Sequence, residues 1–302
     1  MITSNHQRVE SPWLLPGFKT RIFIYLFVFT VVSSLVLLRG SRINHVYNSN
    51  EWDLLIFTQR WPNTVCMEWE ETSPTNHTCA LPKQKDIWTI HGIWPTKLGT
   101  IGPSFCNSSL HFNASQLAPI MNNLTEYWID VEIPEPANSF WRHEWRKHGT
   151  CSASVPQLST EIGYFQTGLD LLQKFNMKGV LGKASVYPDS DSPTDLTSIW
   201  LAIKTTLGVN PSIHCVHDKK TKQYYLQEIR ICFDKSINLV DCDGIKLHHS
   251  FHWQPNGNCP LDKPIFYPAT VPPPSRKPLP PPPATPMANL LNVIQFVMWL
   301  TS

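Results

Sequence analysis

Residues 140–151 read FWRHEWRKHGTC. This stretch and IWTIHGIWP at 87–95 are the most informative parts of the sequence. The two stretches hold three histidines, a carboxylate and a lysine in surroundings crowded with tryptophan. These five residues are His91, His143, Glu144, Lys147 and His148. Groups that can exchange a proton, beside a cation that can hold an anion, are typical of an acid–base site.

The later stretch predicts a short helix that begins near Phe140 and is closed by Gly149. At about 100° per residue, His143 and Lys147 would share one row of this helix, and Glu144 and His148 the adjacent row. The alternative is an exposed polar face with ion pairs between side chains one turn apart. The aromatic residues that flank the stretch, and the cysteine that ends it, favour a partly buried functional helix instead.

The pair His143–Glu144 also suggests the zinc-protease motif H-E-x-x-H. That motif needs its second histidine four residues after the first, where this chain has Lys147. His148 comes one residue later, about 140° around an α-helix from His143, and the spacing therefore argues against a shared metal. We expect no metal and no cofactor here.

Strands and helices are mixed along the chain without the regular rhythm of a parallel α/β fold. Strands are predicted at 54–59, 87–90 and 224–232, and helices at 160–175 and 195–207. We therefore expect an α+β fold with a central antiparallel-rich sheet packed with several helices.

Several features indicate the secretory pathway. Eight cysteines without a C-x-x-C pair indicate four disulfides formed in an oxidising compartment. The uncharged apolar run at 22–38 is typical either of a cleaved signal peptide or of an uncleaved anchor that tethers the protein to a membrane. Four N-x-S/T sequons follow, at Asn76, Asn107, Asn113 and Asn123. These features predict a glycosylated protein of the extracellular space or of a lysosomal or endosomal lumen.

The composition divides the chain into four parts. Residues 1–50 form a tail with the targeting segment, 51–268 a globular domain, 269–286 a proline-rich linker and 287–302 a short apolar segment. That last segment is too short to span a bilayer. The formal net charge of +2 argues against tight, charge-driven binding to duplex nucleic acid.

The two stretches resemble the active-site segments of the ribonuclease T2 family, the acid, base-nonspecific endoribonucleases. The patterns of that family are close to W-x-I/L-H-G-L-W-P and F-W-x-H-E-W-x-K-H-G-T-C, and here Ile93 replaces the usual leucine. The resemblance covers roughly 52–262 and leaves out the leader and the proline-rich tail. It implies a monomeric, metal-independent enzyme that acts on single-stranded RNA.

The resemblance implies four catalytic residues. His148 would take the proton of the ribose 2′-hydroxyl, and His91 would give a proton to the leaving 5′-oxygen. Glu144 and Lys147 would stabilise the negative transition state. The product would be a 2′,3′-cyclic phosphate that is later opened to a 3′-phosphate. One neutral and one protonated imidazole coexist most readily at mildly acidic pH, which suits this chemistry.

The resemblance also implies residues that bind the substrate. His143 would hold a phosphate, and Trp94 would stack on the base 5′ of the cut. Phe140 would belong to the other base site, with Gln59 nearby. Thr96 stands where many members carry Asp or Asn, so base preference at that site is expected to differ. Stacking tolerates any base, which predicts low base specificity.

The family's usual disulfide pairing would join Cys66–Cys79, Cys106–Cys151, Cys215–Cys259 and Cys232–Cys242. We interpret two further groups of histidines as solvated surface residues rather than metal ligands: His214 with His217, and His248 and His249 with His252. A rival hypothesis is a secreted or membrane-tethered glycoprotein that acts by binding or signalling, with cleavage secondary. Intact catalytic positions argue against a purely binding module.

Overall fold

The computed structural model describes residues 51–73, 75–133, 136, 138–245 and 257–273, which belong to one compact unit, Ser49–Ser302. The apolar run at 22–38, most of the proline-rich linker, the C-terminal apolar segment, and His248, His249 and His252 lie outside these described residues. Every helix within them is too short or too polar to cross a bilayer.

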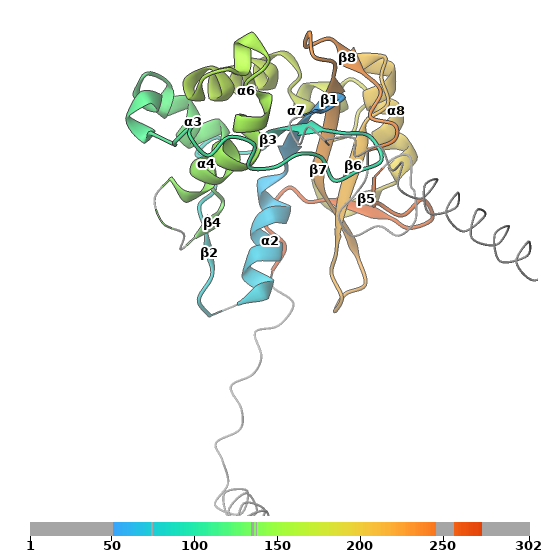
Figure 1. Ribbon diagram of the computed structural model, residues 1–302. Helices are drawn as coiled ribbons and strands as arrows, with labels where there is room; N and C mark the ends of the chain where they lie inside the picture. The colour runs from blue at the N-terminus through green and yellow to red at the C-terminus, as the bar shows by residue number, and fades with distance from the viewer. Residues whose placement is uncertain (1–50, 74, 134–135, 137, 246–256, 274–302) are drawn as a thin grey trace, which may run out of the picture. The chain divides into compact units, whose positions relative to one another are not determined.

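The described chain forms one large sheet, one small sheet and a set of helices (Figure 1). The strands are β1 (Leu54–Arg60), β2 (Thr78–Cys79), β3 (Thr89–Thr96), β4 (Glu132–Ile133), β5 (Asp189–Thr194), β6 (Ser212–His217), β7 (Tyr224–Phe233), β8 (Leu239–Val240) and β9 (Ile265–Tyr267). The α-helices are α2 (Pro62–Thr72), α3 (Met121–Tyr127), α4 (Ser139–Glu144), α5 (Thr150–Ser152), α6 (Glu161–Lys174), α7 (Met177–Gly182) and α8 (Leu196–Leu207). Two 3₁₀ helices, η1 (Ala114–Ile120) and η3 (Pro156–Leu158), and a π-helix, η2 (Trp145–Gly149), complete the set.

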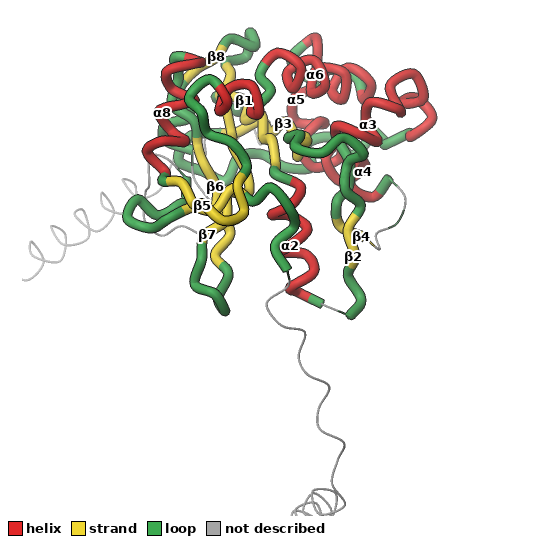
Figure 2. Tube along the Cα trace, turned by 180° about the vertical axis from the view of Figure 1, so that it is seen from behind, coloured by secondary structure: helices red, strands yellow, loops and turns green. Residues whose placement is uncertain are grey.

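The large sheet has seven strands in the order β3-β1-β7-β9-β5, and β6 and β8 also pair with β7. Every pair is antiparallel except β7 with β9. Figures 1 and 2 show α3, α4 and α6 along the flank of the sheet near β3, and α8 along the opposite flank. The prediction of an α+β fold with an antiparallel-rich sheet is confirmed.

Local sequence explains most of the element boundaries. All seven residues of β1 are buried, because β1 lies between β3 and β7 and is covered on both faces. The side chain of Thr160 caps α6 by accepting a hydrogen bond from the backbone N–H of Gly163. Gly208, with φ of 80°, ends α8 in the left-handed conformation that favours glycine.

Two boundaries differ from the prediction. The strand predicted at 87–90 begins at Thr89 and continues through Pro95 to Thr96. Proline is tolerated there because β3 lies at the edge of the sheet, where a missing backbone donor costs no ladder hydrogen bond. The chain also forms an unpredicted helix, α2, directly after β1, since Pro62 stands at a first-turn position where its fixed φ suits a helix.

Tryptophan and four disulfides hold the core together. Trp61, Trp88, Trp128 and Trp145 are among the largest fully buried side chains and belong to one hydrophobic cluster. The disulfides are Cys66–Cys79, Cys106–Cys151, Cys215–Cys259 and Cys232–Cys242, the pairing that the resemblance implied. The second disulfide attaches the segment before η1 to α5.

The interpretation of His214 as a surface histidine is wrong. His214 lies on β6 with only 7% of its surface exposed, and its Nε2 is 3.1 Å from the Ser212 hydroxyl oxygen. Its strand is the neighbour of β7 and is covered, which the short sequence between Gly208 and Lys219 did not indicate. His217, at the end of β6, is exposed as expected.

Candidate active site

His91 stands at an irregularity in the edge strand β3. The register between β1 and β3 shifts there: Thr58 pairs with Gly92 and Gln59 with Ile90, which leaves His91 as an extra residue. Such a bulge re-aims the side chain that it carries. The backbone oxygen of His91 accepts a hydrogen bond from Trp128 Nε1 at 2.9 Å, so the bulge is tied to the helical flank.

A buried carboxylate on β7 fixes the His91 ring. The Nδ1 of His91 is 2.5 Å from Oε1 of Glu228, and the other oxygen of Glu228 accepts hydrogen bonds from Nε and Nη2 of Arg230 at 3.2 and 2.8 Å. Burial raises the pKa of the Glu228 carboxyl, but Arg230 and His91 outweigh it and hold that pKa well below its usual range. The bond at Nδ1 leaves Nε2 of His91 as the nitrogen that faces the site.

The helix that carries His143 and His148 contains a π-turn. Helix α4 gives way at Trp145 to η2, whose hydrogen bonds link residues five apart, and the helical backbone then continues through α5. The prediction that Gly149 closes the helix is therefore wrong, because Gly149 is helical and α5 follows it. Its lack of a side chain serves packing instead, since a Cβ on Gly149 would lie 2.3 Å from the ring of Trp145.

The π-turn changes which side chains of the helix meet. His143 and His148 are five residues apart, and their ring centroids lie 6.4 Å apart. Ligand atoms of His143, Glu144 and His148 all lie within 4.8 Å of one another. The separation predicted for a regular α-helix is therefore wrong, and spacing no longer argues against a metal at this cluster. The expectation that catalysis needs no metal stays a prediction.

Glu144 is buried against Trp94 of the stretch 87–95. Its Oε2 accepts a hydrogen bond of 2.9 Å from Nε1 of Trp94, and the residue is 1% exposed. Burial raises the pKa of Glu144, while the Trp94 hydrogen bond and nearby cations offset part of the rise. A Cβ on Gly92 would lie 2.0 Å from that carboxylate oxygen and 2.3 Å from Trp94 Nε1. Glycine at position 92 therefore allows this contact.

The rings of the two stretches form one cluster. Trp94 lies between two imidazoles, with ring centroids 4.9 Å from His91 and 5.3 Å from His148. The ring of Phe140 also lies close to His91, with its centroid at 5.9 Å. The guanidinium group of Arg230 stands over the Trp94 ring, 5.0 Å from its centroid. The structure thus brings together the two histidines predicted to exchange protons and the two aromatic rings predicted to hold bases.

A cavity of about 320 Å³ opens beside this cluster. It is lined by Arg60, His91, Asp130, Glu132, Ser139, Phe140, His143 and Glu144. The guanidinium group of Arg60 lies 4.5 Å from the centroid of the Phe140 ring and donates a hydrogen bond to the backbone oxygen of Ile129. Burial lowers the pKa of Arg60, and the surrounding carboxylates oppose that change. The cavity thus offers cationic, acidic and aromatic groups within one small space.

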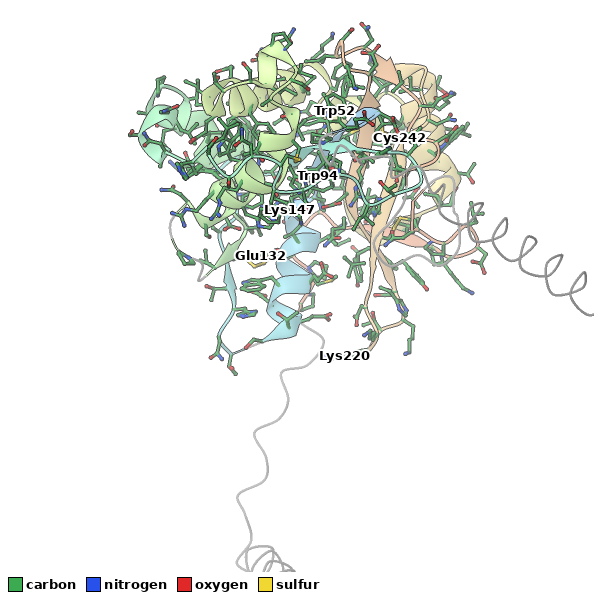
Figure 3. All side chains as sticks on the ribbon, viewed as in Figure 1. Trp52, Trp94, Glu132, Lys147, Lys220 and Cys242 are labelled. Carbon is green, nitrogen blue, oxygen red and sulfur yellow. A yellow bond between two sulfur atoms is a disulfide. The ribbon has the colours of Figure 1, made fainter. Side chains whose placement is uncertain are left out.

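His143, the residue expected to bind a phosphate, lies close to two positively charged groups. The pKa of His143 is lowered by partial burial and by the positive charges of Lys147 and His91. An anion bound beside His143 would offset the positive charges of Lys147 and His91. Figure 3 locates Lys147, together with Trp94, on the whole unit.

Gln59, which was expected near the second base site, lies inside the fold. The Gln59 side chain is fully buried, its Nε2 donates to the backbone oxygen of Phe175 and its Oε1 accepts from the backbone N–H of Met177. Both ends of the amide are thus occupied in joining β1 to the segment between α6 and α7. The expected contribution of Gln59 to the second base site stays a prediction.

Sequence reasoning missed Arg60, Glu228 and Arg230. A signal was available for the pair on β7, because Glu228 and Arg230 are two charged residues, two apart and thus on one face, inside a strand that is otherwise uncharged. Arg60 ends the fully buried strand β1, where a charged residue needs a partner. None of these signals names the partner, which only the folded structure supplies.

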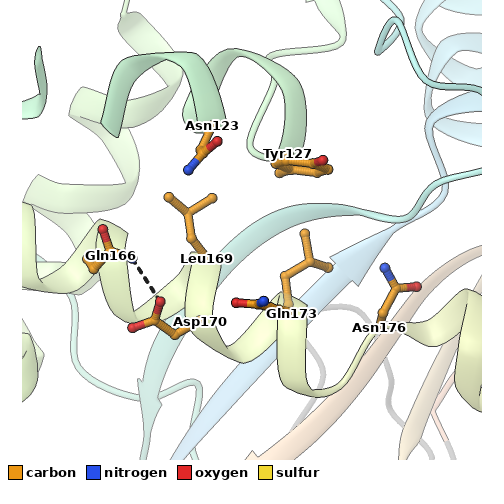
Figure 4. Close-up of a pocket in the computed structure, with 8 residues that line it drawn as sticks. Asn123, Tyr127, Gln166, Leu169, Asp170, Gln173 and Asn176 are labelled. Carbon is orange, nitrogen blue, oxygen red and sulfur yellow. Dashed lines mark hydrogen bonds between the residues drawn. The ribbon is translucent and has the colours of Figure 1, made fainter. Parts of the chain in front are cut away.

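A larger cavity of about 400 Å³ lies away from this site, between α3 and α6 (Figure 4). It is lined by Asn123, Tyr127, Gln166, Leu169, Asp170, Leu172, Gln173 and Asn176, and Gln166 donates a hydrogen bond of 2.8 Å to Asp170. The predicted catalytic residues do not line it. Its rim carries one of the four predicted glycosylation sites, all of which are exposed: Asn76, Asn107, Asn113 and Asn123.

Comparisons with known proteins agree with this geometry. The sequence model of the Ribonuclease T2 family matches residues 52–242. Ribonuclease Oy of Magallana gigas is 36% identical over 220 residues, which cover 72% of this chain and 97% of that protein. The crystal structure of human RNase T2 superposes with a TM-score of 0.57 at 31% identity, over 72% of this chain and 99% of that one. The structure of RNase NT in complex with 5′-AMP gives a TM-score of 0.58 at 28% identity, over 72% and 98%.

Proposed function

Because this chain belongs to the ribonuclease T2 family and is an endoribonuclease of that family, we propose that it cleaves single-stranded RNA by attack of the ribose 2′-hydroxyl on the adjacent phosphate. The observation that carries the proposal is the position of Trp94, whose ring centroid lies 4.9 Å from that of His91 and 5.3 Å from that of His148, because it places both imidazoles and a base-stacking ring in one cluster. The product is a 2′,3′-cyclic phosphate.

His148 and His91 act as the base and the acid of this reaction. His148 removes the proton of the 2′-hydroxyl as the bond from that oxygen to phosphorus forms. His91 gives its Nε2 proton to the 5′-oxygen as the bond from phosphorus to that oxygen breaks. In a second step the roles reverse, water opens the cyclic ester and a 3′-phosphate remains. Each proton transfer contributes about 10²–10⁴-fold to the rate.

The remaining residues of the site stabilise charge. Lys147 faces the phosphoryl oxygens, which carry the negative charge of the transition state, and His143 binds a phosphate of the substrate. Burial raises the pKa of Glu144, and Trp94 holds its carboxyl group beside the cavity, where it helps to stabilise the transition state. Trp94 and Phe140 hold the two bases by stacking, which accounts for low base specificity.

We also propose that the protein matures in the secretory pathway. The eight cysteines form four disulfides within the described residues, and such disulfides form in an oxidising compartment. The four sequon asparagines are exposed, as acceptors of a glycan must be. A shift in mass on enzymatic deglycosylation of the secreted protein tests this part of the proposal.

The central experiment uses the protein purified from a secreting eukaryotic host. It is incubated with single-stranded RNA and EDTA across pH 4 to 8, and the ends are analysed for 2′,3′-cyclic phosphate. We expect cyclic ends, an acidic optimum and no effect of EDTA. His91→Ala and His148→Ala should each lose at least about a hundredfold in rate, whereas His217→Ala, an exposed histidine on β6, should not. Full activity in either active-site variant would overturn the mechanism.

A further inference from the structure

Phe105 is an exposed aromatic residue that the hydrophobic core does not explain. It lies in the segment between β3 and η1, and 56% of its surface is exposed. Within the described part of the chain, it belongs to none of the hydrophobic clusters. Its backbone φ is +53°, a left-handed conformation that a bulky side chain rarely adopts. Exposure and backbone strain together are a cost that packing does not repay at this position.

Two connections to the catalytic helix hold Phe105 in this conformation. Its backbone N–H donates a hydrogen bond of 2.9 Å to the backbone oxygen of Lys147. The next residue, Cys106, is joined by a disulfide to Cys151 in α5. The backbone that carries the ring is therefore fixed relative to the helix that holds His143 and His148.

The Phe105 ring continues the series of rings in the active site. Its centroid lies 6.5 Å from that of His143, nearly perpendicular to it. His143 in turn lies 6.4 Å from His148, and His148 lies 5.3 Å from Trp94. The series therefore runs from the rings proposed to hold the cleaved dinucleotide, through the imidazole proposed to hold a phosphate, to an open aromatic surface.

We propose that Phe105 is a stacking platform for a third base, that of a nucleotide next to the cleaved dinucleotide. Successive bases of single-stranded RNA are joined by phosphates, and His143 lies between Phe105 and the cleavage site, where one such phosphate would pass. An aromatic face contributes about 1–3 kcal/mol per stacked base and accepts any base. The inference rests on the proposed function and adds a binding site beyond the two base sites of the scissile bond.

The test compares substrates of increasing length. KM is measured for a dinucleoside monophosphate and for trinucleotides extended by one residue at the 5′ or at the 3′ end. For the wild type, we expect one of the two extensions to lower KM by about fivefold or more, the lower limit of what one stacked base contributes. Phe105→Ala should lose that gain, and Phe105→Trp should keep it. Whether the 5′ or the 3′ extension lowers KM shows in which direction the RNA strand crosses the site.

Leu98→Ala is the matched control, because Leu98 is an exposed apolar residue of the same segment, 43% exposed. It should keep the gain from extension. An equal gain in Phe105→Ala and in the wild type would overturn the proposal, as would a gain that Leu98→Ala loses equally.

A second measurement separates this inference from the proposed reaction. Binding of non-cleavable 2′-fluoro oligonucleotides of two and three residues is followed by tryptophan fluorescence, with the same four proteins. If the wild type binds the longer analogue more tightly and Phe105→Ala does not, the platform stands even where no RNA is cleaved. If the wild type cleaves RNA but length affects neither KM nor binding, the platform alone is refuted.

Discussion

The Nδ1 of His91 on β3 lies 2.5 Å from Oε1 of Glu228 on β7, across the intervening strand β1. Arg230 holds the second oxygen of that carboxylate, and its guanidinium group also covers the face of Trp94. One carboxylate thus sets the tautomer of the proposed acid, and one arginine connects it to the proposed base-stacking ring.

Glu228→Gln should impair the acid without removing it. The amide can still bond to Nδ1, but it no longer stabilises the imidazolium form. The alkaline limb of the pH profile should therefore move to lower pH. We expect kcat/KM at the wild-type optimum to fall about tenfold or more, since a general acid contributes about 10²–10⁴-fold in total. The pH profile of kcat/KM for a dinucleoside monophosphate measures this. Glu70→Gln on α2 serves as a control, and a lower rate with an unmoved profile would refute a positioning role.

Gly92→Ala should disturb the site through Glu144. The added Cβ would lie within 2.3 Å of both Glu144 and Trp94, so their hydrogen bond must break or the strand must shift. We expect a loss of about 1–3 kcal/mol in the free energy of unfolding, as for other overpacked buried positions, and a lower kcat. Urea unfolding and initial rates test both. Gly179→Ala in α7 is the matched control, because its Cβ would meet nothing within 4 Å and should leave stability equal or slightly higher.

Features that depend on local sequence were predictable. The predicted strands at 54–59 and 224–232 correspond to β1 and β7, and the predicted helices at 160–175 and 195–207 to α6 and α8, because burial and periodicity are encoded within each segment. The two motifs that contain His91 and His148 do lie together in space. Their pairing was implied by the resemblance to the active-site segments of the family.

Features that depend on the packing of distant segments were not predictable. The bulge at His91 arises from the register of β1 against β3, and Glu228 reaches His91 from a position 137 residues away. The π-turn after Glu144 has no marker in the sequence and reverses the conclusion drawn from ideal α-helical spacing. Gln59 was assigned to the substrate by resemblance, whereas its neighbours in space show that it joins two parts of the fold.

Phe105→Gly should stabilise the protein and weaken its binding of substrates longer than a dinucleotide. Glycine adopts a φ of +53° freely, whereas the left-handed conformation is less favourable by about 1–2 kcal/mol for other residues. We expect the free energy of unfolding to rise by about 1 kcal/mol, measured in guanidinium chloride with the disulfides intact. Phe105→Ala removes the same ring but keeps the unfavourable conformation, so it should not be stabilised. Equal stability of the two variants would mean that the backbone at this position carries no strain.

His214 should make the fold less stable in acid. Burial, together with the positive charge of Arg230, lowers the pKa of His214 from 6.5 to about 3. Below pH 6.5 the unfolded chain takes up a proton at this residue and the folded chain does not, so stability falls as the pH drops from 6.5 towards 3 and is fully present only above 6.5. From pH 7 to pH 5 this single residue should remove about 2 kcal/mol. Urea unfolding at several pH values measures the slope, which should flatten in His214→Gln and persist in His217→Gln, since His217 is exposed on the same strand. Parallel stability profiles for wild type and His214→Gln would show that His214 does not titrate between the two states, and other buried groups would then have to account for any sensitivity to acid.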